Sequence, residues 1–354
     1  MNASLVREDC RKALDGRTDA LRPLRGETVL IAGGTGFVGT WLAETLACLN
    51  DDFGFGCRIS LLARGTERFA AARPHLAARP DVRLIRTDVR HVSELPRETN
   101  WLVQAAATPD NRFHASSPVE TMSAIVEGTA SVIRALDPLS DFRRMLYLSS
   151  GYVYGSQPWD LPAVPESFPG APALGSASSA YSEAKRCAET LCASARSQKR
   201  VPIAIARLFA FLGPYQALDT PWAANNFLND ALSGRPIRIQ GDGETVRSYM
   251  YGSDMAFWLL RLLTAEEPGR AWNVGSPEAV TLRDLAGLIA SRVNPVPEIR
   301  LHAATHGNAP RTRFVPDIAA AQKGLGLEAR FSLADAIERT VQWNRSQVPI
   351  TANR

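Results

Sequence analysis

The glycine-rich segment Gly33–Gly39 constrains the fold most strongly, because it joins an apolar run at residues 28–31 to an amphipathic run at residues 41–49. The first run is typical of a buried strand and the second of a helix. In the spacing G-x-x-G-x-x-G, Gly33 permits a tight turn, Gly36 lets backbone approach a phosphate, and Gly39 lets the helix pack on the strand. The helix N-terminus would supply free N–H groups to that phosphate. This context favours a dinucleotide site over a glycine-rich turn without a ligand.

Further apolar, β-rich runs alternate with helical patterns up to about residue 209. The expected strands are residues 58–62, 82–85, 101–104, 145–149 and 203–208, and the expected helices are residues 66–78, 117–136 and 180–195. Such alternation predicts an α/β fold, with a Rossmann-type doubly wound parallel sheet. The 24 residues 156–179 hold five prolines, and we expect a functional loop there.

The pattern changes after residue 209, which suggests a second unit. Helices are expected at 223–233, 254–264 and 281–293, with a short strand at 271–274. We therefore expect a dinucleotide-binding domain over 27–209 and a smaller C-terminal α+β substrate lobe over 210–354, with some return of chain to the first domain. Residues 1–26 are expected to be a helical extension. Its Leu5, Ala13 and Leu14 could pack on the sheet or on a partner subunit, or the helix could fray at the surface.

Composition excludes several function classes. The 354 residues carry a net charge of +4 without a Lys/Arg run, which argues against nucleic acid as a partner. No long apolar run or signal peptide is evident, so we expect no membrane association. The histidines and cysteines show no metal-ligand spacing, and we expect no metal. An odd number of cysteines suggests reduced thiols and a cytoplasmic protein; these are Cys10, Cys48, Cys57, Cys187 and Cys192.

The end of the second expected strand indicates which cofactor binds. An acid there would bind the ribose 2′-OH of NAD, whereas an arginine accommodates the 2′-phosphate of NADP. The strand ends Leu61-Leu62-Ala63-Arg64-Gly65, without an acid. Arg64 offers a forked phosphate donor, although it could also be a solvated surface arginine. We expect NADP, with NAD as the alternative.

Tyr181 and Lys185 stand four residues apart in an expected helix and therefore share one face. A nearby cation favours phenolate, so we expect Lys185 to lower the pKa of Tyr181 from about 10. A tyrosine tuned in this way could exchange a proton with a sugar hydroxyl. The preceding expected strand runs into Ser149-Ser150, at the sheet edge where open α/β sheets bind ligands. There the serine hydroxyl could bind the reacting oxygen.

These features together resemble the extended short-chain dehydrogenases/reductases of the nucleotide-sugar epimerase/dehydratase type. The resemblance covers about residues 27–345. The similar segments are Gly33–Gly39, Asp88-Val89, Gln104–Ala107, Ser149–Gly155, Tyr181–Lys185, Arg207–Phe209 with Gly213-Pro214, Gly241–Gly243 with Arg247–Tyr249, and Asn273–Gly275.

The resemblance implies roles for individual residues. Ser150, Tyr181 and Lys185 would be the catalytic triad, and Asn226 and Arg247 would hold the nucleotide and diphosphate of the substrate, with help from Arg313. It also suggests a homodimer. The implied cofactor-binding residues, with Arg64 from the reasoning above, are Gly33, Thr35, Gly36, Phe37, Val38, Gly39, Arg64, Asp88, Val89, Ala105, Ala106, Ala107, Tyr181 and Lys185.

One departure from the family bears on the reaction. Similar 4,6-dehydratases carry an Asp-Glu pair after the catalytic Ser or Thr, and related decarboxylases keep the glutamate. Here these positions hold Gly151 and Tyr152. Dehydration is therefore disfavoured, unless Glu166 or Asp160 enters the site from the proline-rich loop.

The leading hypothesis is an NAD(P)-dependent oxidoreductase that reduces a keto sugar, or oxidises a hydroxyl, on a nucleoside-diphosphate sugar. The alternative enzyme is a nucleotide-sugar 4-epimerase with a tightly bound cofactor. A third hypothesis is an NADP sensor without catalysis. The presence of Ser150, Tyr181 and Lys185 together disfavours it.

Overall fold

The computed structural model describes residues 2–108, 110–267, 269–302 and 312–347. Within them, seven parallel strands form one sheet in the order β11-β6-β5-β4-β1-β2-β3. The central strand β1 is buried along its whole length, as expected for a parallel sheet covered on both faces. The sheet strands are β1 (Thr28–Ala32), β2 (Arg58–Ala63), β3 (Val82–Arg86), β4 (Trp101–Gln104), β5 (Arg144–Ser150), β6 (Ile203–Leu208) and β11 (Ala271–Val274).

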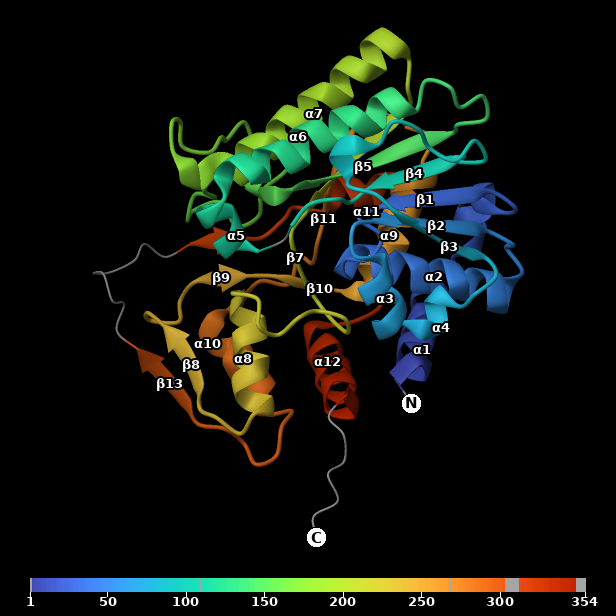
Figure 1. Ribbon diagram of the computed structural model, residues 1–354. Coiled ribbons are helices and arrows are strands. Elements are labelled where there is room, and N and C mark those ends of the chain that lie inside the picture. Colours follow the sequence, from blue (N-terminus) through green and yellow to red (C-terminus); the bar gives the residue numbers. More distant parts are fainter. Residues whose placement is uncertain (1, 109, 268, 303–311, 348–354) are drawn as a thin grey trace.

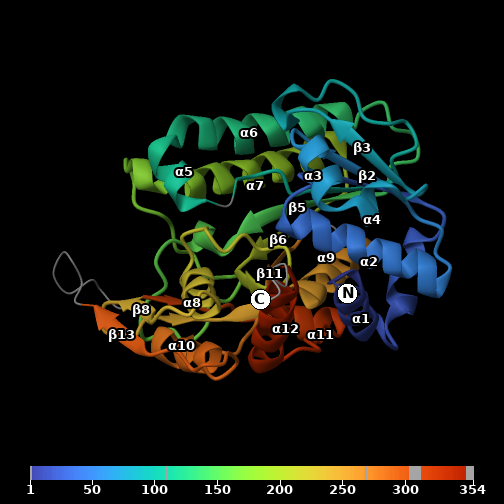
Figure 2. The same cartoon turned by 60° about the horizontal axis from the view of Figure 1, so that its bottom comes forward.

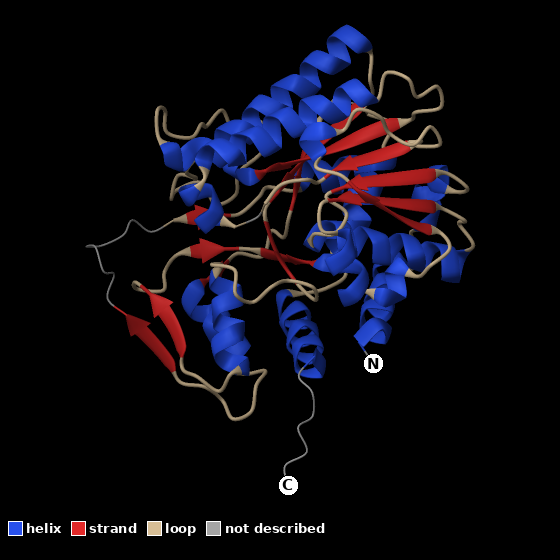
Figure 3. Cartoon of the chain, viewed as in Figure 1, coloured by secondary structure: helices blue, strands red, loops and turns tan. Residues whose placement is uncertain are grey.

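Helices cover both faces of this sheet (Figures 1 and 3). The helices α6 (Pro118–Ala135) and α7 (Ala180–Lys199) share one apolar core with the sheet, whereas α2 (Phe37–Phe53) and α9 (Gly252–Thr264) share the other. The sequence therefore predicts the doubly wound α/β fold correctly. Shorter helices are α3 (Thr66–Ala72), α4 (Pro74–Ala77) and α5 (Asn111–Ser116), with 3-10 turns at Thr18–Leu24, Val89–His91, Gly151–Tyr154 and Ala177–Ser179.

The chain after β6 forms a second lobe that faces the C-terminal ends of the strands (Figure 1). Its helices are α8 (Ala223–Leu232), α10 (Leu282–Ala290), α11 (Ala319–Leu325) and α12 (Leu333–Gln347). Its small sheets pair β7 (Ala210–Leu212) with β10 (Tyr249–Tyr251), β8 (Ile237–Gln240) with β13 (Ile299–His302), and β9 (Val246–Arg247) with β12 (Val280–Thr281) and β14 (Arg313–Phe314). The chain also returns to the first unit, because β11 extends the main sheet and α9 packs beneath it.

The N-terminal extension forms helix α1 (Asn2–Leu14), which packs against α2, α9 and α12. Figure 2 shows α1, α9, α11 and α12 clustered on one side of the molecule. Val6, Cys10 and Leu14 are fully buried there. The surface-frayed alternative is therefore wrong, since a helix that buries three apolar side chains is part of the core.

Two expected helices have different bounds in the structure. The helix expected at 66–78 is broken into α3 and α4, with Pro74 as the first residue of α4. Proline lacks the N–H that a continuous helix would need at that point. Helix α2 begins at Phe37, inside the glycine-rich segment, so its first turn faces the phosphate-binding loop.

Candidate active site

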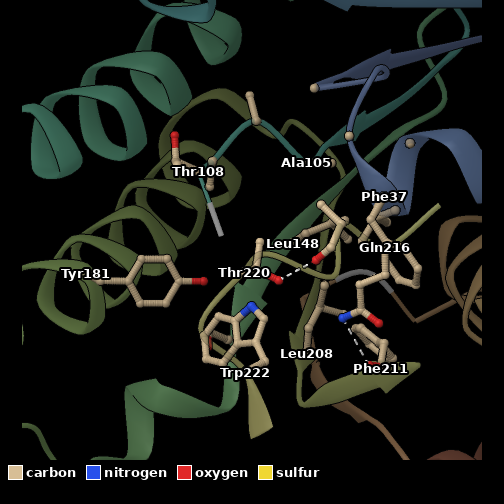
Figure 4. Close-up of a pocket in the computed structure, with 18 of the residues that line it drawn as sticks. Phe37, Ala105, Thr108, Leu148, Tyr181, Leu208, Phe211, Gln216, Thr220 and Trp222 are labelled. Atoms are coloured by element: carbon tan, nitrogen blue, oxygen red, sulfur yellow. Dashed lines mark hydrogen bonds between the residues drawn. The ribbon is translucent and has the colours of Figure 1, made fainter. Parts of the chain in front are cut away.

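A pocket of about 890 Å³ lies at the C-terminal ends of β1, β2, β4, β5 and β6, beneath the second lobe. This volume is at the upper end of the range for small-molecule sites. Residues of both lobes line it, from Gly33 in the first to Leu282 and Phe314 in the second. Figure 4 shows the phenol of Tyr181 directed into the pocket from α7, together with Trp222 from the second lobe.

The glycine-rich loop lines one end of the pocket with bare backbone. Gly33 has a φ of 82°, a conformation that favours glycine, and its N–H donates to the Leu62 carbonyl at 2.8 Å. A Cβ atom added to Gly36 would meet only the Gly33 carbonyl oxygen, at 3.4 Å. Phe37 and Val38, in the first turn of α2, also line the pocket. An anionic group can thus approach the helix N-terminus closely, and the loop fits a dinucleotide pyrophosphate.

Basic side chains gather where β2 and β3 end. Arg64, Arg68 and Arg90 line this part of the pocket with Asp88. Two hydrogen bonds join Arg90 to the Asp88 carboxylate at 2.9 and 3.1 Å, and this arginine holds the pKa of Asp88 at about 2. Arg64 Nη1 lies 3.9 Å from Asp88 Oδ2, with 72% of its side chain exposed. This end therefore presents a net positive, partly solvated surface.

The remaining cofactor residues predicted from the sequence line the same pocket. Ala105, Ala106 and Ala107 follow β4, and the Ala105 N–H donates to the Ala32 carbonyl at 2.8 Å. Val89 and Gly39 also line it, as does Thr35 in the loop before α2. The small alanine side chains leave room beside the glycine-rich loop for a flat ligand.

The predicted triad comes together at the centre of the pocket. Ser150 ends β5, and its side-chain oxygen accepts the Tyr152 N–H at 3.2 Å. Ser150 and Tyr181 line the same pocket. Lys185 is buried, and its Nζ donates to the Leu148 carbonyl at 2.6 Å. The same Nζ lies 5.8 Å from the centre of the Tyr181 ring. One oxygen held between the Ser150 and Tyr181 hydroxyls would therefore be well placed for proton exchange.

The expected effect of Lys185 on Tyr181 is corrected by this geometry. Burial raises the pKa of Tyr181 to about 12, opposed by the hydrogen bond from Ser150. Burial also lowers the pKa of Lys185 to about 8. The lysine is directed at a carbonyl rather than at the phenol, so desolvation outweighs its attraction for a phenolate. At neutral pH the site therefore holds a protonated phenol, which is a proton donor.

His114 stands on α5 and lines the pocket, although it was not among the predicted site residues. Its ring stacks on the ring of Tyr181 with a centroid distance of 4.4 Å and an interplanar angle of 13°. Nε2 donates to the Thr108 carbonyl at 2.6 Å, and burial lowers the pKa of His114 below 6.5. The neutral imidazole thus fixes the orientation of the phenol. Its place just after β4, at the ligand-binding edge of the sheet, was the available sequence signal.

The predicted substrate residues divide into one inside the pocket and two outside its lining. Arg247 lines the pocket and donates to the Thr312 carbonyl and hydroxyl at 3.2 and 3.0 Å. Asn226 is exposed and absent from the lining, whereas its neighbour Asn225 is fully buried and lines the pocket. Arg313 also lies outside the lining, with its guanidinium 4.9 Å from the centre of the Trp159 ring.

The asparagine assignment is corrected because consecutive helical residues point in different directions. Asn225 Nδ2 donates to the Ala217 carbonyl at 2.8 Å and to Thr220 Oγ1 at 2.5 Å. Its Oδ1 is buried without a protein partner. A buried acceptor of this kind is usually satisfied by a ligand or by water. Of the two asparagines, Asn225 is therefore the one that the structure places at the pocket.

The two loop acids that could have restored dehydratase chemistry do not line the pocket. The Glu166 carboxylate accepts the Asn273 N–H at 2.9 Å, and its backbone carbonyl accepts from Arg207. Asp160 is exposed on the surface of the loop. The proline-rich loop instead pairs with the second lobe, through Gln157 with Arg313 and Val164 with Pro316.

Two further findings concern metal binding and membrane spans among the described residues. Among the described residues, no group of three or more His, Cys, Asp or Glu side chains is arranged to hold a metal ion. Over the same residues, no helix has both the length and the apolar composition needed to cross a bilayer.

The fold is that of a Rossmann-type protein with a pocket at the C-terminal edge of its parallel sheet, and comparison with known proteins narrows the class. A sequence profile of the NAD dependent epimerase/dehydratase family matches residues 29–275. UDP-glucuronic acid decarboxylase 5 of Arabidopsis thaliana is 31% identical over 316 residues, which cover 87% of this chain and 86% of the relative. UDP-glucuronic acid decarboxylase 2 of the same plant is 28% identical over 330 residues, 92% and 69% of the two chains. The chain belongs to the NAD dependent epimerase/dehydratase family.

Solved structures agree with the fold. A dTDP-glucose 4,6-dehydratase from Streptomyces venezuelae with bound NAD superposes with a TM-score of 0.77 at 22% identity, over 90% of this chain and 97% of that one. A UDP-glucuronic acid 4-epimerase from Bacillus cereus, in complex with UDP-glucuronic acid and NAD, gives 0.78 at 21% identity, over 91% and 100%. Members of one fold thus catalyse different reactions, so the reaction must be argued from the site.

Proposed function

We propose that this protein is an NAD(P)-dependent oxidoreductase that reduces a keto group, or oxidises a hydroxyl, on the sugar of a nucleoside diphosphate sugar. The observation that carries the proposal is that Ser150, Tyr181 and Lys185 line one pocket. The single carboxylate in its described lining, Asp88, is paired with Arg90 where β2 and β3 end. The nicotinamide cofactor would supply or accept the hydride. The protein's own residues would hold the sugar and move one proton.

Tyr181 is the proton donor in the direction of reduction. Its high pKa keeps the phenol protonated at neutral pH, so the hydroxyl can deliver a proton to a ketone oxygen as that oxygen gains charge. Ser150 donates a second hydrogen bond to the same oxygen. Lys185 places a positive charge behind the phenol and stabilises the phenolate left after proton transfer.

The second lobe would bind the remainder of the substrate. Arg247 offers a forked donor for the diphosphate, and the Asn225 amide offers an unpaired acceptor. Residues 210–354 would in this way act as the substrate lobe and residues 27–209 as the cofactor domain. A homodimer remains part of the proposal on family resemblance.

The preferred cofactor in this proposal is NADP. The end of β2 presents Ala63 and Arg64 to the pocket instead of an acid, and Arg68 adds a second cation nearby. A ribose 2′-phosphate would meet positive charge there. Asp88, the carboxylate in this region, is already neutralised by Arg90.

A nucleotide-sugar 4-epimerase is the second candidate, because hydride removal and return would use the same three residues. The site favours either reaction over dehydration or decarboxylation, since Gly151 and Tyr152 supply no acid and Glu166 is bound elsewhere. Removing water needs a general acid and a general base in addition to the hydride step.

One experiment separates these reactions. The nucleotide that co-purifies with the protein is identified by mass spectrometry, and the protein is then incubated with nucleotide sugars and their 4-keto forms, with and without NADPH. Reduction should oxidise NADPH in proportion to product, whereas epimerisation should convert the sugar with no net change in nicotinamide absorbance. Loss of water or carbon dioxide from a substrate would contradict the proposal.

A further inference from the structure

An aromatic wall stands beside the catalytic tyrosine; it consists of Tyr152, Phe314 and Phe209. The Tyr152 ring lies edge-on to Tyr181, with centroids 6.4 Å apart and an interplanar angle of 81°. Tyr152 stacks on Phe314 at 4.7 Å and 19°, and Phe314 packs on Phe209 at 4.5 Å. All three rings line the pocket, so a sugar whose oxygen reaches Tyr181 must lie against aromatic surface.

The packing of this wall excludes a side chain at position 151. A Cβ atom on Gly151 would lie 2.8 Å from Phe209 Cζ and 2.9 Å from Phe314 Cζ. Burial also raises the pKa of Tyr152, so its hydroxyl stays neutral. Of the two positions that directly follow Ser150, Tyr152 therefore contributes an aromatic ring and a neutral hydroxyl to the pocket, and Gly151 contributes no side chain.

The charged side chains of the described lining are engaged elsewhere. Asp88 and its arginine neighbours stand at the ends of β2 and β3, and Lys185 donates to the Leu148 carbonyl. His114 is neutral and donates to the Thr108 carbonyl. Arg247 is the cation of the second lobe in this lining, and its charge opposes the rise in the pKa of Tyr152. The proposed function assigns Arg247 to the diphosphate.

We propose that the aromatic wall selects a sugar whose exocyclic carbon is uncharged, a hydroxymethyl or methyl group, and rejects uronic acids. The proposal rests on the proposed function. If C4 reacts, only C5 separates it from the exocyclic carbon, so that carbon lies in the shell formed by Tyr152, His114 and Tyr181. Aromatic faces carry partial negative charge and pack well on C–H groups. A carboxylate there loses its hydration, and Arg247, the cation of the second lobe in the described lining, is the one assigned to the diphosphate.

The test begins with the nucleotide, so that the two proposals can fail separately. Isothermal titration at pH 8, where His114 is neutral, first ranks UDP, dTDP, GDP and CDP on the protein saturated with NADPH. For the nucleotide that binds most tightly, the dissociation constants of its hexose conjugate and of the matching uronic acid conjugate are then compared. If none of the four nucleotides binds, the proposed function is contradicted and the inference fails with it.

We expect the hexose form to bind at least about tenfold more tightly than the uronic acid, the discrimination that an unpaired buried charge imposes. Equal or tighter binding of the uronic acid would overturn the inference while leaving the nucleotide-sugar site intact.

A pair of variants then attributes the selectivity to the wall. Tyr152→Phe keeps the ring and should keep the preference for the hexose. Tyr152→Lys places a cation beside the exocyclic carbon. It should lower the ratio of the uronic acid's dissociation constant to that of the hexose about tenfold, mainly through tighter binding of the uronic acid. If the ratio of the two dissociation constants is the same in Tyr152→Lys and in wild type, the wall does not set the selectivity. Near-UV circular dichroism checks that both variants are folded.

Discussion

Replacing Arg64 with alanine should reduce the preference for NADPH over NADH. Arg64 stands at the end of β2 with 72% of its side chain exposed, and its nearest acid, Asp88, is 3.9 Å away and already bound by Arg90. A hydrogen bond between charged groups contributes about 1.5–3 kcal/mol, and solvent exposure places Arg64 at the lower limit. About 1.5 kcal/mol corresponds to roughly a tenfold loss in kcat/KM for NADPH. NADH lacks the 2′-phosphate and should be unaffected.

The assay is steady-state kinetics with both coenzymes at saturating sugar. Arg83→Ala is the matched control, because Arg83 is an exposed arginine on the neighbouring strand β3 that pairs with Glu98 outside the pocket. It should leave both coenzymes unchanged. An equal loss for NADPH and NADH in Arg64→Ala, or a wild-type preference for NADH, would refute the assignment of Arg64 to a 2′-phosphate.

Three further predictions address the site and the extension. Burial lowers the pKa of Lys185 to about 8, so kcat for reduction should fall as pH rises through about 8 and Lys185 loses its charge. Lys185→Met should remove this fall from the pH profile of kcat. If the fall persists in Lys185→Met, a group other than Lys185 causes it. Asn225→Ala should raise KM for the nucleotide sugar about tenfold, whereas Asn226→Ala should leave KM unchanged. Equal changes of KM in the two variants would contradict the choice of Asn225 over Asn226. Leu14→Ala should lower the free energy of unfolding, measured by denaturant titration, by about 2–5 kcal/mol. Its control Asp15→Ala, at an exposed position, should lower it by less than about 0.5 kcal/mol. If Leu14→Ala lowers the free energy of unfolding as little as Asp15→Ala does, α1 is not part of the core.

The architecture could be read from the sequence because buried parallel strands are continuous apolar runs, and the glycine-rich segment marks where the first of them ends. The predicted helix bounds and helix faces were less accurate where a single residue decides them. Pro74 splits a predicted helix, and a one-residue difference in helix phase separates the exposed Asn226 from the buried Asn225. The predicted start of this helix at residue 223 is correct, so the packing of α8 against β8 and α10 decides which of its faces is buried.

That Ser150, Tyr181 and Lys185 line one pocket was predictable because each stands in a recognisable local context. The electrostatics of these residues were not predictable, since the pKa of Tyr181 depends on burial by residues distant in the chain. His114, 67 positions before Tyr181, stacks on its ring. Spacing along the sequence indicates which groups share a helix face, but not which groups desolvate them.

The turnover of Tyr181→Phe tests the central claim most directly. The variant removes one hydroxyl and keeps the ring that stacks on His114, so nucleotide and nucleotide-sugar binding should be preserved. Loss of the proton donor should lower kcat about 10²–10⁴-fold, measured as NADPH oxidation and sugar product in the same reaction. Undiminished turnover with intact binding would contradict the assignment of Tyr181 as the group that exchanges a proton with the sugar.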